Sequence, residues 1–196
     1  MHLRTCRLLL LALGVAGCRH GDASPQRSPT TAVASAKPSA TKSPAESVAV
    51  ARVRARFAAH FAGGQGFGID TLRARQTWFT PCLYSLMLAD MAGDSARGGV
   101  GYLNWDPFTA SQDDASAFHV DDAERAHDSV LVLVRVEYPG AANRPTSMVV
   151  ATTQVGGEWR IANIVTPKVN LAAGLDSSLR ADSAAANRPY AGCSRP

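Results

Sequence analysis

Apolar residues recur at helical spacing in the first part of the chain that can fold. Four of them share one predicted helix face: Val50, Val53, Phe57 and Phe61. The preceding Ser43-Pro44-Ala45-Glu46 has the order of a capping box, with serine at the N-cap, proline at N1 and glutamate at N3. Gly63 and Gly64 are expected to end this helix, because glycine favours the conformation in which helices stop.

Two more helical segments are expected before the middle of the chain. Asp70 can begin a short helix that runs to Trp78. Thr80-Pro81 then reads as an N-cap followed by proline at N1, and it predicts a third helix that ends at Gly93. The apolar face of that helix consists of Leu83, Leu86, Met87 and Met91.

After residue 115, the spacing of apolar residues changes from the helical period to the alternation that is typical of strands. Phe118 and Val120 begin one predicted strand, and valines alternate with other residues from Val130 to Tyr138. The β-branched run 148–155, the Gly156-Gly157 turn and the apolar residues of 159–164 add a hairpin. Helices first and strands second indicate an α+β fold with an antiparallel meander. After Pro167 the chain is rich in Ala and Ser, and leucines at positions 171, 175 and 179 allow a marginal helix.

The start of the chain resembles a bacterial lipoprotein signal. A short basic segment is followed by the apolar stretch Leu8–Leu13 and by Val15-Ala16-Gly17-Cys18, in which small residues precede a cysteine. The resemblance implies that residues 1–17 are removed and that the Cys18 thiol carries lipid; the alternative is an ordinary secretory leader beside a chance cysteine. The longest apolar run has ten residues, whereas a membrane-spanning helix needs about 20.

A flexible tether is expected between the lipid and the folded domain. Of the 24 residues in 22–45, 18 are Ala, Ser, Thr or Pro, and the one bulky apolar residue is Val33. Such a composition buries too little apolar surface to offset the entropy lost on ordering. We therefore expect 18–45 to be a disordered tether, 46–167 the folded domain and 168–196 a C-terminal extension.

Cysteine usage predicts one disulfide. Cys6 leaves with the leader and Cys18 is assigned to lipid, so Cys82 and Cys193 remain as an even pair in an oxidising compartment. Their bridge would tie the C-terminal extension to the third helix. Two buried free thiols are the alternative, and no sequence neighbour of Cys82 suggests a base that would make it a nucleophile.

The net charge of +4 does not indicate nucleic-acid binding. Residues 1–45 hold six of the 20 Lys and Arg residues and one acid, which leaves 14 basic and 15 acidic residues from Glu46 onward. A domain that binds phosphates is expected to carry its own basic face. No nucleic-acid partner is therefore expected.

One acidic stretch stands out between Arg97 and Arg125, which enclose no other Lys or Arg. Its acids are Asp106, Asp113, Asp114, Asp121, Asp122 and Glu124. They could form a solvated rim, bind calcium, or provide a pocket acid, for which Asp113 is the first candidate. His119 is a candidate general base, but a surface or hydrogen-bonded histidine is favoured for it, as for His60 and His127. The histidine spacing does not fit a zinc site, and no metal or cofactor is expected.

The long segment 94–115 carries aromatic residues and little periodicity, as functional loops often do. Five residues, most of them in this loop, are candidates for a pocket: Trp105, Asp106, Gln112, Asp113 and Trp159. For Trp159 the hydrophobic core is favoured over the pocket, because aromatic side chains normally fill the interior of such a fold. The glycine-rich Gly64–Gly68 follows a helix and lacks the Lys-Ser/Thr ending of a phosphate loop, so it is interpreted as a connection.

Several short pieces, in order, resemble a bacterial lipoprotein family, domain of unknown function 3828, within the nuclear transport factor 2-like superfamily. They are Phe79-Thr80-Pro81, Asp106-Pro107-Phe108, Gln112-Asp113, the strand Val130–Tyr138 and the closing segment Trp159–Ile164. The resemblance covers about residues 47–166. It implies a cone fold, in which N-terminal helices pack on a curved antiparallel sheet, and an envelope location. That family has no established activity, so no catalytic residue is carried over.

These observations favour a membrane-anchored binding module over an enzyme. The expected partners are membrane lipid through Cys18 and an unidentified protein or small-molecule ligand, with a homodimer possible. A small-molecule enzyme that uses a pocket carboxylate and an envelope immunity or inhibitor protein are the alternatives. Arg19 after the lipid site favours the outer membrane, where one exists, on the periplasmic side.

Overall fold

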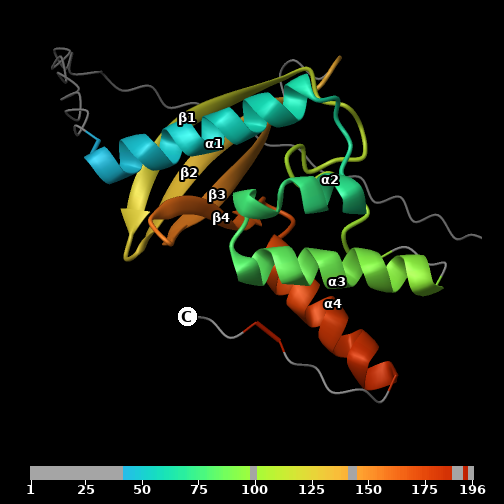
Figure 1. The fold of residues 1–196 in the computed structure, drawn as a ribbon. Coiled ribbons are helices and arrows are strands. Elements are labelled where there is room, and N and C mark those ends of the chain that lie inside the picture. Colours follow the sequence, from blue (N-terminus) through green and yellow to red (C-terminus); the bar gives the residue numbers. More distant parts are fainter. Residues whose placement is uncertain (1–41, 98–100, 141–144, 187–191, 194–196) are drawn as a thin grey trace, which may run out of the picture. The chain divides into compact units, whose positions relative to one another are not determined.

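In the part of the chain that the structure describes, three α-helices and one 3₁₀ turn precede a four-stranded sheet, and a fourth α-helix follows it (Figure 1). The computed structural model describes residues 42–97, 101–140, 145–186 and 192–193. The helices are α1 (Pro44–Ala62), α2 (Ile69–Ala74), a 3₁₀ turn (Gln76–Trp78), α3 (Pro81–Arg97) and α4 (Leu171–Ala185). The strands are β1 (Ala117–Ala126), β2 (Ser129–Glu137), β3 (Thr146–Val155) and β4 (Glu158–Val165). The predicted α+β class is confirmed.

The sheet is an antiparallel meander in the order β1-β2-β3-β4. Val134 on β2 lies opposite Val120 on β1 and opposite Met148 on β3. The register shifts once between β1 and β2 and once between β3 and β4. Such irregularities bend a strand and increase its local twist.

Helix α1 packs across one face of this sheet (Figure 1). Its capping box is present as predicted: Ser43 Oγ accepts from the Glu46 amide at 3.2 Å, and the Glu46 carboxylate accepts from the Ser43 amide at 2.6 Å. The helix ends at Gly63, also as predicted. The inward residues of β2 are fully buried in the core beside this helix: Val130, Val132, Val134 and Val136. Burying one such side chain stabilises a fold by about 1.5–3 kcal/mol.

The residues after Pro167 contribute to the same core. Leu171 and Leu175 of α4 are completely buried, and this helix packs against α3 and β4. Asn170 begins α4 as its N-cap, because its side-chain oxygen accepts from the Ala173 amide at 3.2 Å. The expected marginal helix is therefore a packed element of the domain.

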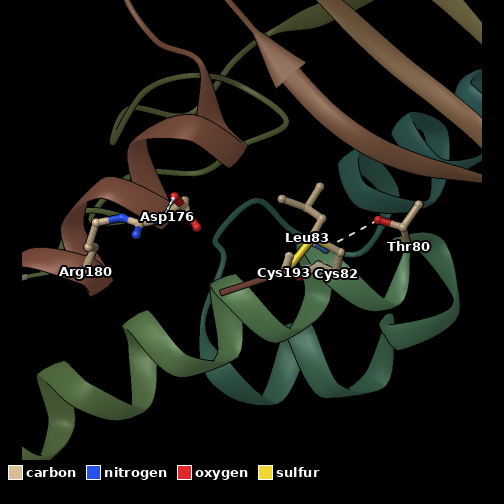
Figure 2. Close-up of a disulfide and its surroundings, with 6 residues drawn as sticks. All are labelled: Thr80, Cys82, Leu83, Asp176, Arg180 and Cys193. Carbon is tan, nitrogen blue, oxygen red and sulfur yellow. Dashed lines mark hydrogen bonds and ion pairs between the residues drawn. A yellow bond between two sulfur atoms is a disulfide. The ribbon is translucent and has the colours of Figure 1, made fainter. Parts of the chain in front are cut away.

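Cys82 and Cys193 form a disulfide, as the cysteine usage predicts (Figure 2). Their Cα atoms lie 5.4 Å apart. Cys82 is in the first turn of α3, where Thr80 Oγ1 accepts from the Leu83 amide at 3.3 Å and so caps the helix (Figure 2). The Thr80 amide donates to the Ile161 carbonyl on β4 at 2.9 Å. The bridge thus joins the C-terminal segment to a point already fixed on the sheet.

Two predicted helix boundaries were wrong. Helix α3 continues past Gly93 to Arg97, because an interior glycine costs only about 1 kcal/mol and the flanking residues favour helix. The expected helix from Asp70 to Trp78 is broken at Arg75 into α2 and a 3₁₀ turn.

The leader, Cys18 and the tether up to residue 41 lie outside the described residues. Within the described ranges, no helix combines the length and the apolar character needed to cross a membrane.

Candidate functional site

A cavity of about 320 Å³ opens between the connection after α1 and the long loop before β1. This volume is near the lower end for small-molecule sites, which occupy about 300–1,000 Å³. The connection contributes Gln65, Gly66 and Phe67 to the lining. The loop contributes Leu103, Asn104, Trp105, Asp106, Thr109, Ser111, Gln112, Asp113 and Asp114.

The loop wall of the cavity is held by its own hydrogen bonds. The Asp106 amide donates to the Ser111 carbonyl at 2.9 Å, and the Ala110 amide donates to the Asp106 carbonyl at 2.7 Å. The Gln112 side-chain amide donates to the Asn104 carbonyl at 2.8 Å. Ala110 has a φ of 57°, a left-handed conformation that closes this tight turn. The wall is therefore ordered before any ligand arrives.

Gln65 joins the two sides of the cavity. Its side-chain nitrogen donates to the Ala115 carbonyl and its side-chain oxygen accepts from the Ala115 amide, each at 2.5 Å. This two-way bond imitates the pairing of neighbouring strands and fixes the end of the loop. The glycine-rich connection thus supplies part of the site in addition to joining two helices.

Asp106 is the most buried carboxylate of the lining, with 8% of its surface exposed. One carboxylate oxygen accepts from the Phe108 amide at 2.8 Å, and the other accepts from the Gly66 amide at 3.2 Å. His60 Nε2 lies 2.7 Å from the second oxygen, a close polar contact that is not aligned as a hydrogen bond. These groups hold the carboxylate in one orientation.

His60 lies behind Asp106 on α1 and is completely buried. Its ring stacks on Phe108 with the centroids 4.6 Å apart. Arg75 Nη1 lies 2.5 Å from His60 Nδ1. Because arginine can only donate, Nδ1 is the acceptor, and the proton of a neutral His60 is on Nε2, toward Asp106. The three residues form a chain of contacts from Arg75 through His60 to the cavity.

Burial and a neighbouring carboxylate act in opposite directions on Arg75. Burial lowers the pKa of its guanidinium, and the charge of Asp106 works to raise it. The guanidinium also lies 4.7 Å from the centre of the Trp78 ring, a cation–π contact. The positive charge of Arg75 is therefore stabilised both by the Asp106 carboxylate and by the Trp78 ring.

A second buried carboxylate, Asp90 of α3, holds the start of the loop. It accepts from the Tyr102 amide at 3.3 Å and from the Leu103 amide at 2.8 Å. Burial, followed by the charge of Asp90, raises the pKa of the Tyr102 phenol. The position of Leu103 in the cavity wall is therefore set from α3.

A second hollow of about 530 Å³ adjoins the first and shares Ser111, Asp113 and Asp114 with it. Its other walls come from Ala110, Tyr138, Pro139 and Thr146. The Tyr138 hydroxyl donates to the Thr109 carbonyl. Burial raises the pKa of the Tyr138 phenol. The Asp113-Asp114 pair therefore lies on the boundary between two concave surfaces.

The structure brings four of the five predicted pocket residues together in the cavity lining: Trp105, Asp106, Gln112 and Asp113. Trp159 lies elsewhere. It is 5% exposed in the core at the start of β4, and its carbonyl accepts from Arg56 at 2.6 Å. His119 is exposed on β1 with its Nε2 3.0 Å from the Glu137 carboxylate, and it does not line either hollow.

Sequence reasoning missed His60, Arg75, Gln65 and Asp90 as parts of the site. A signal existed for His60, which is seven positions after Val53 and so continues the apolar face of the first helix. A histidine in such a position needs a buried partner. Nothing local in the sequence pairs it with Asp106 or Arg75.

Metal binding by this arrangement is not favoured by its geometry. Among the residues that the structure describes, no group of three His, Cys, Asp or Glu side chains converges as a metal site. In comparisons with known proteins, no family model, curated protein or solved structure matches this chain.

Proposed function

We propose that this chain is a cell-envelope lipoprotein whose folded domain binds a small ligand in the cavity beside Trp105 without transforming it. The observation that carries the proposal is the cavity wall, in which Asp106 and the loop around it are fixed by hydrogen bonds in advance. A wall that is already ordered loses little entropy on binding, which favours affinity.

The positions of the titratable groups support binding over catalysis. A general base must reach the proton that it removes, and His60 has no exposed surface. Asp106 accepts from two backbone amides and is approached by His60, so most of the lone-pair positions through which it could take a proton are already occupied. This network positions a carboxylate and does not supply a reactive group.

The proposal of a lipid anchor is supported by the sequence alone. The basic start, the apolar stretch and the small residues before Cys18 support export and lipidation, and the resemblance to a lipoprotein family with a cone fold supports the same location. Helices that precede an antiparallel meander are compatible with that fold. Mass spectrometry of the mature protein should find Cys18 as its lipidated first residue, and Cys18→Ser should release the protein from membranes.

Native mass spectrometry of the protein purified from the envelope of the cells that produce it tests the binding function. The expected result is a retained small molecule that is lost from Asn104→Trp, in which an exposed residue of the lining is replaced by a bulky ring. Gln154→Trp is the matched control, because it places the same ring on an exposed amide position of β3, outside both hollows.

A retained molecule in both variants would place the ligand elsewhere and overturn the proposal. An empty wild-type protein that co-purifies only with a protein partner, or only as a bare dimer, would overturn it in favour of an interaction module.

A further inference from the structure

The charge of the cavity lining indicates the class of ligand. Three carboxylates line the cavity, those of Asp106, Asp113 and Asp114, and among the described residues none of the lining side chains is Lys or Arg. We infer that the ligand is a small organic amine that binds through a protonated primary ammonium group. This inference rests on the proposed function, in which the cavity holds a ligand.

Asp106 provides a fixed acceptor for such a group. A carboxylate has about four lone-pair positions. Two of them accept the backbone amides of Phe108 and Gly66, and a third is approached by His60. About one position is left on a carboxylate that lines the cavity and is mostly shielded from water. Charge-assisted hydrogen bonds in such a setting are stronger than neutral ones.

Two neutral polar side chains of the lining are engaged in the wall, whereas the exposed Asn104 side chain makes no hydrogen bond to the residues that the structure describes. Both polar atoms of the Gln65 side chain bond to Ala115, and the Gln112 nitrogen bonds to the Asn104 carbonyl. The Asp113 and Asp114 carboxylates, in contrast, are exposed and make no hydrogen bond within the part of the chain that the structure describes. The charged groups of the lining are therefore all anionic, and they would repel phosphates and carboxylates.

Trp105 adds a surface that suits a cation more than a neutral alcohol. It is half-buried beside Asp106 in the lining. A cation within about 6 Å of an indole ring is attracted by the ring's negative face. An ammonium group held by Asp106, Asp113 or Asp114 with its carbon chain against Trp105 would use both kinds of contact.

Isothermal titration calorimetry of the full mature chain at low salt tests this inference with a matched pair of probes. Butane-1,4-diamine and butane-1,4-diol have the same carbon chain and differ in charge. We expect the diamine to bind at least about tenfold more tightly, because hydrogen bonds to charged groups contribute more than neutral ones. Asp113→Asn combined with Asp114→Asn should weaken diamine binding by about tenfold.

Asp128→Asn serves as the matched control. It removes the same charge from an exposed aspartate at the β1–β2 turn, outside the cavity, and it should leave the affinity within about twofold of the wild-type value. Thermal unfolding of the double variant and of the control checks that both fold, which is expected because the three replaced carboxylates are exposed.

Three results would overturn the inference. The diol could bind as tightly as the diamine, the Asp113 and Asp114 replacements could have no more effect than Asp128→Asn, or calcium could bind more tightly than the diamine. If native mass spectrometry finds a retained neutral molecule and the diamine does not bind, the assignment of the ligand as an organic amine would be wrong, but the proposed ligand-binding function would stand. If no molecule is retained and the diamine does not bind, both the amine assignment and the proposed ligand-binding function would be wrong.

Discussion

His60 Nε2 lies 2.7 Å from a carboxylate oxygen of Asp106, and the two residues join α1 to the wall of the cavity. His60 is completely buried, and Arg75 approaches its other ring nitrogen at 2.5 Å. The orientation of the cavity carboxylate therefore depends on two residues that no ligand in the cavity could touch directly. The stability of the fold and the geometry of the proposed site are coupled at this point.

His60→Leu should destabilise the domain by about 2–4 kcal/mol, because it leaves Asp106 and Arg75 without their shared partner in a buried setting. Urea unfolding of the two proteins measures the difference. His119→Leu is the control, since His119 is an exposed histidine that pairs with Glu137, and its replacement should cost less than about 1 kcal/mol. Equal effects of the two substitutions would contradict the structural role of His60.

Gly174→Ala should destabilise the protein although alanine favours helices. A β-carbon at Gly174 of α4 would overlap the ring of Tyr102, and overpacking of this kind costs about 1–3 kcal/mol. In a Tyr102→Ala background the overlap is absent, and the same substitution should stabilise the helix by about 0.5–1 kcal/mol. A double-mutant cycle by denaturant unfolding shows whether the sign reverses. A stabilising effect in both backgrounds would exclude close packing of Tyr102 on α4.

Removing the disulfide should lower stability substantially. The Cys82–Cys193 bridge spans 111 residues, and in a chain-entropy treatment a loop of that length contributes about 4–5 kcal/mol. We expect Cys82→Ser combined with Cys193→Ser to unfold at much lower denaturant concentration than the oxidised wild type. The reduced wild type should match the double variant. An unchanged unfolding midpoint after reduction would show that the bridge does not constrain the unfolded chain.

The Asp121–Arg135 pair should make stability depend on acid pH. The hydrogen bond from Arg135 to Asp121, which joins β1 to β2, holds the pKa of the Asp121 carboxyl below its ordinary value. The folded state therefore binds fewer protons than the unfolded state, so the contribution is present above the unfolded pKa and is lost as pH falls through the folded pKa. Because the pair is partly exposed, Asp121→Asn should cost no more than about 1 kcal/mol at neutral pH.

The unfolding free energy of wild type and Asp121→Asn, measured from neutral to acid pH, checks this dependence. The difference should shrink toward zero as the pH falls below the lowered folded-state pKa of Asp121, because the carboxyl is then protonated in both the folded and the unfolded state. Glu124→Gln, an exposed acid on the same strand, should show a smaller difference at neutral pH. A difference that grows as the pH falls would have the wrong sign.

Local signals in the sequence predicted most of the fold. The Ser43–Glu46 capping box, the alternating valines of β2 and the Gly156-Gly157 turn each determine their element through neighbouring residues. The end of α3 was predicted wrongly, because one glycine at position 93 does not stop a helix whose flanks favour it.

Only the part of the site that lies within one loop could be predicted from the sequence. Trp105, Asp106, Gln112 and Asp113 belong to one loop, so their common position in the cavity lining follows from their nearness in sequence. Trp159 lies in the core at the start of β4, which confirms the favoured prediction for this residue. Arg75 and His60 reach Asp106 only through the packing of α1 and α2 against the loop, which no sequence spacing reveals.

An NMR titration of the ¹⁵N-labelled chain with butane-1,4-diamine tests the central claim most directly. We predict chemical-shift changes confined to the lining of the cavity, with the Trp105 indole N–H and the Gln65, Gly66, Asp113 and Asp114 amides most affected. These changes should disappear when Asp113 and Asp114 are replaced by asparagine. Shifts spread over acidic residues across the whole surface, or no shifts at the cavity at saturating diamine, would contradict the assignment of this cavity as an organic-amine site.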